Sequence, residues 1–360
     1  MIQFLYSHPF LIGLISFVIG LISMPLVVEI ARKKHFVVRP NKRTCHSGEI
    51  PNIGGVNICF SFLLTFMLFE LNSLQESQYL LIGVFVIVIV GLVDDILVLS
   101  PLSKLIGEIF AGVVLIGFAD IRISHLHGLF GVTEMGILAS YGISFFLLLA
   151  IINALNLIDG VDGLASGLGI LYCASFATYF LLTGETAWAI LGICLIGSLA
   201  VFFIYNVFGK KQKIFLGDSG SLLLGYVMTA FVFRVMEMNA YHLVPDSLHM
   251  NATPMVALAI LTIPMFDMAR VSLTRILHGT SPFQADRNHI HHLLLQTGLN
   301  HLQTTCVLLS MSLVFIGLAI VGRNWNMWLL LGINATIFTL FVICIKLRIK
   351  HQTAIDNDKH

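Results

Sequence analysis

Residues 79–104 read YLLIGVFVIVIVGLVDDILVLSPLSK, an apolar run that leads into two adjacent aspartates. A helix needs about 20 predominantly apolar residues to cross the hydrocarbon core of a bilayer, so the run predicts a membrane-spanning helix. Two anions at the C-terminal end of a helix oppose the helix dipole, and near a membrane they also lose hydration. Capping alone therefore does not explain Asp94 and Asp95, and the stretch predicts a polar site where this helix ends.

The whole chain shares this apolar character. Of its 360 residues, 57% are hydrophobic and 11% are charged, and the mean hydropathy is +0.92. Soluble domains carry roughly 25% charged residues, so the composition excludes them and indicates a polytopic membrane protein. The net charge of +1 also excludes a basic domain that binds nucleic acid and an acidic disordered chain.

Eleven apolar runs are candidates for membrane-spanning helices. With a periplasmic N-terminus and a cytoplasmic C-terminus, seventeen of the twenty Lys and Arg residues lie on the cytoplasmic side, which is the side they favour. In this orientation Trp188, Trp325 and Trp328 lie at outer helix ends, where aromatic residues anchor membrane proteins. We therefore expect an all-α polytopic fold. The predicted spans are 10–30, 53–71, 79–94, 102–119, 136–155, 164–182, 188–206, 219–236, 253–269, 304–321 and 327–346.

The predicted organisation is a single transmembrane domain over residues 1–349, followed by a short polar cytoplasmic tail over 350–360. Nearly every polar cluster in the chain falls in the predicted cytoplasmic segments or at their edges, so we expect a site on that face. These segments are 31–52, 95–101, 156–163, 207–218 and 270–303.

The first polar cluster joins Asp94 and Asp95 to Lys104. Ser100 and Pro101 are typical of an N-cap and the first residue of a new helix, which puts Lys104 one turn into that helix. Neighbouring helical residues point about 100° apart, so we expect the two aspartates to have different partners. A lysine here can hold a phosphate and an aspartate together. The alternative is a structural Asp–Lys pair.

The second cluster is NALNLIDGVDGLA at 153–165, in which Asn153, Asn156, Asp159 and Asp162 recur at every third position. Side chains three residues apart share one helix face, and two glycines end the helix there. Four oxygen-bearing side chains on one edge suit a hard cation or a polyhydroxyl ligand. Helix capping explains one such side chain more easily than all four.

The third cluster, FLGDSGSLLLG at 215–225, opens an apolar helix with glycine and serine shortly after three lysines. Free N–H groups at such a helix start bind phosphate, and a carboxylate beside them can hold the Mg²⁺ that neutralises it. Asp218 is the candidate carboxylate, and Phe215 begins the motif. Alone the motif is ambiguous, because Asp218 is equally suited to be an N-cap.

The fourth cluster reads DRNHIHH at 286–292, in the longest predicted cytoplasmic loop. Arg287 is suited to bidentate phosphate binding, and His289, His291 and His292 follow it. We interpret them as phosphate contacts, with a zinc site or ordinary loop packing as alternatives. Hard oxygen ligands in the other loops argue against zinc.

The first predicted loop, RPNKRTCHSGEIPNIGG at 39–55, adds His46. Much of the positive charge in this region is explained by membrane topology and by contact with anionic lipid heads. His46 is followed by a proline and a glycine pair, which fits a shaped loop better than a purely electrostatic one.

In this order and at these spacings, the clusters resemble the polyprenyl-phosphate N-acetylhexosamine-1-phosphate transferase family. The SPFQADRNHIHHLLL stretch at 281–295 and the PNKRTCH and IPNIGG segments at 40–55 are most similar to the bacterial members that start O-antigen and enterobacterial common antigen synthesis. The likeness covers about residues 31–298. One departure is Val38, where the family often has an acidic residue, which leaves one contact of the first loop in doubt.

The resemblance implies an eleven-helix enzyme of the bacterial inner membrane with a cytoplasmic active site. Its substrates would be UDP-GlcNAc and undecaprenyl phosphate, its products undecaprenyl-diphospho-GlcNAc and UMP, and its cofactor Mg²⁺ or Mn²⁺. Membrane lipids would surround the enzyme and no nucleic acid would bind to it. A homodimer is possible.

The resemblance also implies a role for each cluster. Asp218 and Asn156 would hold the metal on the diphosphate, and Asp94, Asp95 and Lys104 would position and deprotonate the lipid phosphate. The expected catalytic residues are Asp94, Asp95, Lys104, Asp159 and Asp162, of which the last two line the uridine-diphosphate pocket. The expected substrate-binding residues are His46, Asn153, Phe215, Arg287, His289, His291 and His292.

The implied chemistry is in-line phosphoryl transfer, which depends mostly on positioning and on neutralisation of charge. The second pKa of a phosphate monoester is about 6, so direct attack by the lipid phosphate is favoured over a covalent aspartyl intermediate. Phospho-N-acetylmuramoyl-pentapeptide and UDP-GalNAc transferases of the same family are alternatives. A secondary transporter is an alternative of another class, although it should show inverted repeats.

Overall fold

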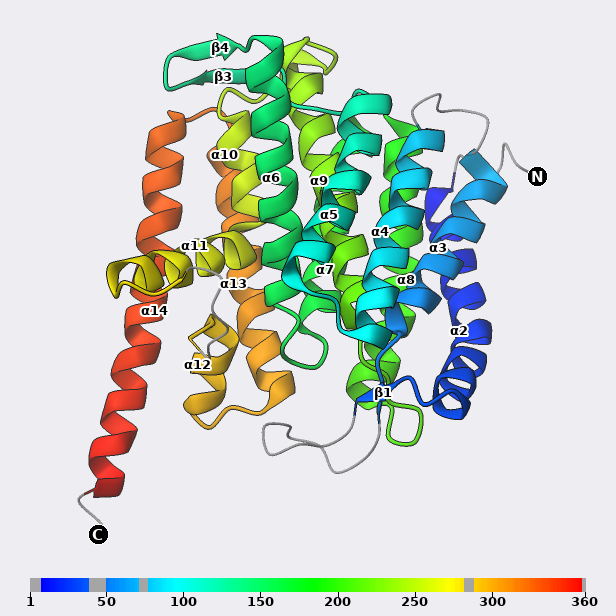
Figure 1. The fold of residues 1–360 in the computed structure, drawn as a ribbon. Coiled ribbons are helices and arrows are strands. Elements are labelled where there is room, and N and C mark those ends of the chain that lie inside the picture. The colour runs from blue at the N-terminus through cyan, green and yellow to red at the C-terminus, as the bar shows by residue number, and fades with distance from the viewer. Residues whose placement is uncertain (1–7, 39–49, 71–76, 282–287, 358–360) are drawn as a thin grey trace.

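The computed structural model describes residues 8–38, 50–70, 77–281 and 288–357. Most helices run side by side in one bundle (Figure 1). Nine helices of these residues are long and apolar enough to cross a membrane, so the chain is an all-α multi-pass membrane protein. They are α2 (Pro9–Lys33), α4 (Ser77–Leu97), α5 with η1 (Pro101–Gly112 and Val113–Phe118), α6 (Ile137–Leu157), α7 (Leu164–Leu182), α8 (Thr186–Phe208), α9 (Gly217–Ala240), α13 (His301–Val321) and α14 (Met327–Asn357).

Two of the predicted spans do not correspond to single helices long enough to cross a membrane. The span 53–71 corresponds to α3 (Gly54–Glu70), a helix of 17 residues. The span 253–269 is instead two helices, α10 (Thr253–Ile260) and α11 (Thr262–Leu277), bent by 87°. Counting the bent pair as one span gives up to ten full spans in the described residues. The count of eleven and the orientation of the termini therefore stay predictions.

The predicted span 253–269 is broken between α10 and α11. Pro264 is the third residue of α11. A proline inside a helix removes the hydrogen bond to the carbonyl four residues earlier and clashes with that carbonyl. Here that residue is Ile260, the last of α10. As a result α11 runs across the bundle, whereas the long helices run along it (Figure 1).

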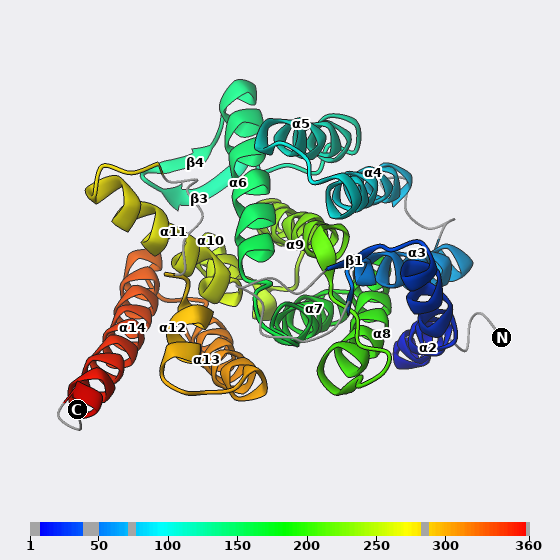
Figure 2. The same ribbon diagram turned by 60° about the horizontal axis from the view of Figure 1, so that its bottom comes forward.

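Helix α9 forms the centre of the bundle. It lies among α3, α4, α6 and α7 (Figure 2), and nearly all of its side chains are buried. Because lipid tails are as apolar as these side chains, close van der Waals packing is what holds such a helix in place. The third polar cluster opens α9, so it lies where the central helix begins.

Trp188 is not the interfacial anchor that the sequence predicts. It is 1% exposed and packs against Phe180 and Phe231. The guanidinium of Arg234 lies 5.7 Å from its ring centre and also pairs with Glu185 at 2.9 Å. The correction has a simple cause, since the position of a tryptophan along a span does not say whether it faces lipid or protein.

The two ends of the bundle differ. At one end β3 (His125–Leu129) and β4 (Val132–Glu134) pair as an antiparallel hairpin. The opposite end holds the antiparallel pair β1 (Val37–Val38) and β2 (Ile50–Pro51), the turns after α4 and α6, the start of α9 and the short helix α12 (Ile290–Gln296) (Figure 1). The described residues of all four polar clusters therefore gather at this second end.

Candidate active site

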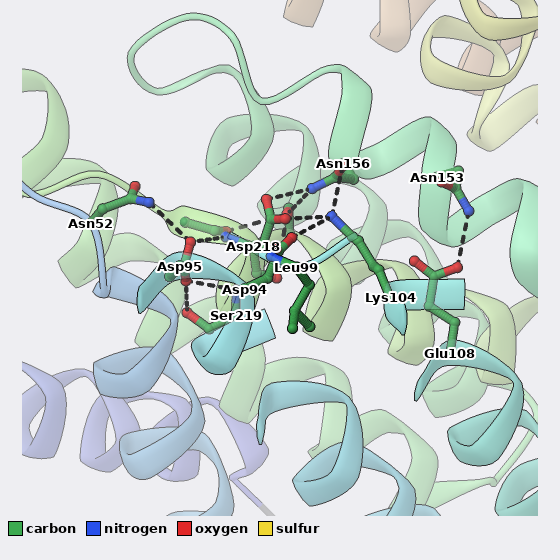
Figure 3. A network of polar contacts seen from close by, with 12 residues as sticks. Asn52, Asp94, Asp95, Leu99, Lys104, Glu108, Asn153, Asn156, Asp218 and Ser219 are labelled. Carbon is green, nitrogen blue, oxygen red and sulfur yellow. Dashed lines mark hydrogen bonds and ion pairs between the residues drawn. The ribbon is translucent and has the colours of Figure 1, made fainter. Parts of the chain in front are cut away.

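Asp95 ties the start of α9 to α4. Its carboxylate accepts hydrogen bonds from the N–H groups of Asp218 at 2.7 Å and Ser219 at 3.1 Å, from the Ser219 hydroxyl at 2.9 Å and from the Asn52 amide at 2.9 Å (Figure 3). The first N–H groups of a helix have no partner within the helix, so this carboxylate of α4 caps α9, whose own N-cap residue makes no side-chain capping bond. Gly217 permits the approach, because its φ is +72° and a Cβ there would lie 2.5 Å from the Asp95 Oδ2.

Asp94, Lys104, Asn156 and Asp218 form one network contributed by four helices (Figure 3). The Lys104 ammonium pairs with Asp218, and it lies 3.3 Å from the Asp94 Oδ2 and 3.4 Å from the Asn156 Oδ1. The Asn156 amide donates to the Asp218 Oδ1 at 2.9 Å and to the Ser221 hydroxyl at 2.8 Å. The structure thus brings together residues of the first three clusters.

The oxygens around Lys104 also suit a divalent cation. Those of Asp94, Asn156 and Asp218 already converge on one positive charge, and Mg²⁺ prefers such hard ligands. In the described part of the chain, no group of three or more His, Cys, Asp or Glu side chains could hold a metal ion by itself. Proteins usually bind Mg²⁺ through one or two carboxylates together with substrate phosphates and water. The residues therefore fit a cation that would bind together with a diphosphate, with Asp218 and Asn156 as the side chains that would hold it.

Asn153 does not reach this network. Its amide donates to the Glu108 Oε2 at 3.1 Å and to the Leu149 carbonyl at 2.8 Å, beside Lys104 (Figure 3). Glu108 is 2% exposed and follows Lys104 by one turn of α5. Glu108 was not predicted as a site residue, although an ionisable residue inside an apolar span indicates a functional site by default.

Asp159 and Asp162 lie between α6 and α7 in different surroundings. The Asp162 Oδ2 accepts from Lys213 at 2.7 Å and lies 3.0 Å from the His301 Nδ1. Burial alone would raise the pKa of Asp162, but the contacts with His301 and Lys213 outweigh it and hold that pKa below its usual value. Burial, followed by the charges of Asp218 and other carboxylates, raises the pKa of Asp159 to about 8. Asp162 is therefore an anchored anion, and Asp159 is protonated at neutral pH.

Phe215 connects the first loop to the third cluster. Its N–H donates to the Pro51 carbonyl at 2.8 Å, and its carbonyl accepts from the Gly54 N–H at 2.9 Å. The Lys213 ammonium lies 5.8 Å from the centre of its ring, within the range of a cation–π contact. Since Lys213 also holds Asp162, the aromatic ring lies near the turn between α6 and α7.

The histidines of the fourth cluster lie against that same turn. His291 is 1% exposed, and a Cβ on Gly160 would lie 2.9 Å from its Cδ2. Burial, followed by the nearby charge of His292, lowers the pKa of His291 to about 3, so its ring is neutral. The ring of His289 is nearly parallel to that of His291, with 5.9 Å between their centres. Packing against the second cluster therefore brings the fourth cluster to the site.

Two further residues belong to this arrangement and were not predicted. Asp267 on α11 lies 2.9 Å from the His289 Nδ1, and His301 at the start of α13 contacts Asp162. Asp267 was detectable as a charge in an apolar span. His301 had no comparable signal, since its partner lies 139 positions away. Two predicted substrate-binding residues, His46 and Arg287, lie outside the residues that the structure describes.

A bundle of membrane helices with a lysine, carboxylates and amides clustered at one end suits an enzyme that transfers a phosphorylated group at a membrane. The family model described as glycosyl transferase family 4 matches residues 77–236, which contain the first three clusters. Together with the relatives described next, this match supports a glycosyl-1-phosphate transferase enzyme.

Similarity to individual proteins extends beyond the family match. The chain is 28% identical over 325 residues to the undecaprenyl-phosphate alpha-N-acetylglucosaminyl 1-phosphate transferase of Escherichia coli (strain K12), covering 88% of this chain and 86% of that protein. The Yersinia pestis protein of the same name is 29% identical over 332 residues, with the same coverage. The Bacillus subtilis protein named as a probable undecaprenyl-phosphate N-acetylglucosaminyl 1-phosphate transferase is 28% identical over 349 residues, covering 96% of this chain and 92% of that protein.

Proposed function

We propose that the protein transfers GlcNAc-1-phosphate from UDP-GlcNAc to undecaprenyl phosphate, giving undecaprenyl-diphospho-GlcNAc and UMP. The site would lie on the cytoplasmic face of a bacterial inner membrane, and the reaction would be the first membrane step of O-antigen or enterobacterial common antigen-type glycan synthesis. The names of the Escherichia, Yersinia and Bacillus relatives support this choice of substrates.

The observation that carries the proposal is the position of the Lys104 ammonium among oxygens of Asp94, Asn156 and Asp218. In-line phosphoryl transfer needs reactants that are held in line with each other, and it needs groups that neutralise the charge that develops. Lys104 would hold the acceptor phosphate, with Asp94 orienting the ammonium. Asp218 and Asn156 would hold Mg²⁺ or Mn²⁺, which when bound supplies electrostatic stabilisation of the donor diphosphate.

Asp95 would act as a positioning residue in this reaction. A carboxylate offers about four lone-pair sites, and the carboxylate of Asp95 already accepts four hydrogen bonds. It would have to release the start of α9 before it could attack phosphorus or accept a proton. A phosphate oxygen of the lipid, largely ionised near neutral pH, needs no such residue to become a nucleophile. The contacts therefore favour direct attack over a covalent intermediate on Asp95.

The test of the proposed function is release of UMP by the purified protein. With UDP-GlcNAc, undecaprenyl phosphate and Mg²⁺, we expect UMP and a new lipid-linked GlcNAc, and we expect neither when lipid or cation is left out. Parallel reactions with UDP-GalNAc and with UDP-N-acetylmuramoyl-pentapeptide compare the alternative donors. Turnover of either one in preference to UDP-GlcNAc would replace the proposed substrate, and absence of UMP from all three would refute the reaction.

Cation binding is expected to strengthen as pH rises towards 8. Asp159 has a pKa of about 8, so below this pH it is mainly neutral, and a bound cation favours its ionised form and lowers its pKa. Mn²⁺ affinity measured by electron paramagnetic resonance between about pH 6 and 9 should therefore increase, with uptake of Mn²⁺ accompanied by proton release. Asp159→Asn should flatten this dependence. An equally steep dependence in Asp159→Asn would assign the proton to another group.

A further inference from the structure

Asp267 is a buried carboxylate on α11 that the proposed reaction leaves without a role. It is 1% exposed, and three groups surround it. The Arg270 guanidinium donates to its Oδ1 at 2.7 Å, the Ile290 N–H donates to the same oxygen at 3.0 Å, and its Oδ2 lies 2.9 Å from the His289 Nδ1. A carboxylate is costly to bury without such partners, so the position of Asp267 is set by the residues at the start of α12.

Asp267 affects His289 in two ways, through the capping of α12 and through the hydrogen on the imidazole Nδ1. His289 is the N-cap residue of α12, yet its own side chain makes no capping hydrogen bond. The cap comes instead from Asp267 through the Ile290 N–H. Because a carboxylate accepts but does not donate, the Nδ1 of His289 must carry the hydrogen of their contact. The other ring nitrogen, Nε2, is then the one available to a ligand.

The bend of the ninth predicted span is what brings these residues together. Since α11 turns across the bundle near Pro264 (Figure 1), Asp267 comes within hydrogen-bonding distance of Ile290 at the start of α12. The His289 ring lies parallel to His291, which packs on Gly160 in the turn that carries Asp159 and Asp162. Among the described residues, none hydrogen-bonds the Nε2 of His289.

We propose that Asp267 is a positioning residue that holds the His289 imidazole through Nδ1 and presents Nε2 to the diphosphate of the nucleotide sugar. This role rests on the proposed function, because the donor diphosphate is the ligand that Nε2 would meet. Phosphate oxygens only accept hydrogen bonds, so Nε2 must carry a proton to bind them. In the bound state both ring nitrogens would then donate, Nδ1 to Asp267 and Nε2 to a phosphate oxygen.

Asp267→Asn tests this role while keeping the size of the side chain. Its carbonyl can still accept from Ile290, but its NH₂ group faces the His289 Nδ1 and no longer supports a hydrogen there. We expect kcat/KM for UDP-GlcNAc to fall about 10- to 100-fold, the usual cost of losing a carboxylate that orients a histidine. The KM for undecaprenyl phosphate should stay within about twofold. Asp246→Asn, the same change at an exposed residue of η2 (Asp246–Leu248), is the control and should change neither.

A double-mutant cycle separates orientation of His289 from simple fastening of α12. If Asp267 acts through His289, adding Asp267→Asn to His289→Gln costs no further activity. Losses that add would show that Asp267 only fastens the helix and would overturn the proposal. Melting temperatures of all variants in detergent report whether each one is folded.

A spectroscopic measurement on the unsubstituted protein does not depend on turnover. The protein is labelled with ¹⁵N-histidine, held in nanodiscs and studied by NMR, and the His289 signals are assigned by their loss in His289→Gln. These signals should show a proton on Nδ1. The Nε2 signal should shift when UDP-GlcNAc is added. A hydrogen on Nε2 alone would overturn the role of Asp267, even in a protein that makes UMP. A protonated Nδ1 in a protein that makes no UMP would refute the proposed function and leave the Asp267–His289 contact intact.

Discussion

Asp218→Asn is expected to lower UMP formation by about 10³-fold or more while the protein still folds. Asp218 pairs with Lys104, accepts from Asn156 and is the carboxylate that we assign to the cation. Asparagine has nearly the same shape, and its carbonyl can still accept from Asn156. It lacks the negative charge that Lys104 and a divalent cation both need. Turnover and Mn²⁺ binding, measured on the same preparation, should therefore be lost together.

The control for this variant is again Asp246→Asn, which should leave turnover and Mn²⁺ binding unchanged. The melting temperature of Asp218→Asn should stay close to that of the unsubstituted protein, because its hydrogen bond with Asn156 can persist. Retained activity would refute the metal role of Asp218. Loss of turnover with undiminished Mn²⁺ binding would instead assign Asp218 to the orientation of Lys104.

The membrane helices were predictable because a segment in lipid must satisfy its backbone hydrogen bonds internally, which makes an apolar run helical. The packing of those helices was not predictable in the same way. An apolar sequence has the same hydropathy against lipid as against protein, so nothing distinguished the central α9 or the buried Trp188 beforehand. Pro264 was a visible cue for the break, but Pro25 lies inside the continuous helix α2. Proline alone therefore does not decide whether a span bends.

The residue types of the candidate site could be predicted from the sequence, but most of the contacts among those residues could not. The clusters around Asp94, Asn156 and Asp218 were recognised separately, and the structure joins them through Lys104. The capping of α9 by Asp95 could not be predicted, because its N–H partners lie 123 and 124 positions further along the chain. Such contacts depend on how the helices pack, which local sequence patterns do not specify.

Gly55→Ala is expected to destabilise the protein by about 3 kcal/mol or more, at the upper end of the cost of overpacking. A Cβ on Gly55 would lie 2.5 Å from the Gly220 Cα and 2.5 Å from the carbonyl carbon of Ser219. Both are backbone atoms, so no change of rotamer relieves the clash. α3 would have to move away from α9, although the Gly55 N–H donates to the Leu216 carbonyl at 2.9 Å. The melting temperature and the yield of monodisperse protein in detergent measure the effect.

Gly332→Ala in α14 is the matched control, because nothing lies within 4 Å of the added Cβ. Alanine is a better helix former than glycine by about 1 kcal/mol, so this variant should be as stable as the unsubstituted protein or more so. Whatever fraction of Gly55→Ala folds should also lose UMP formation, since a displaced α3 draws Asn52 away from Asp95 and disturbs the cap on α9. Unchanged melting and activity in Gly55→Ala would mean that α3 can shift without moving the partners of Asp95. The contact between α3 and α9 would then not be what places Asp218.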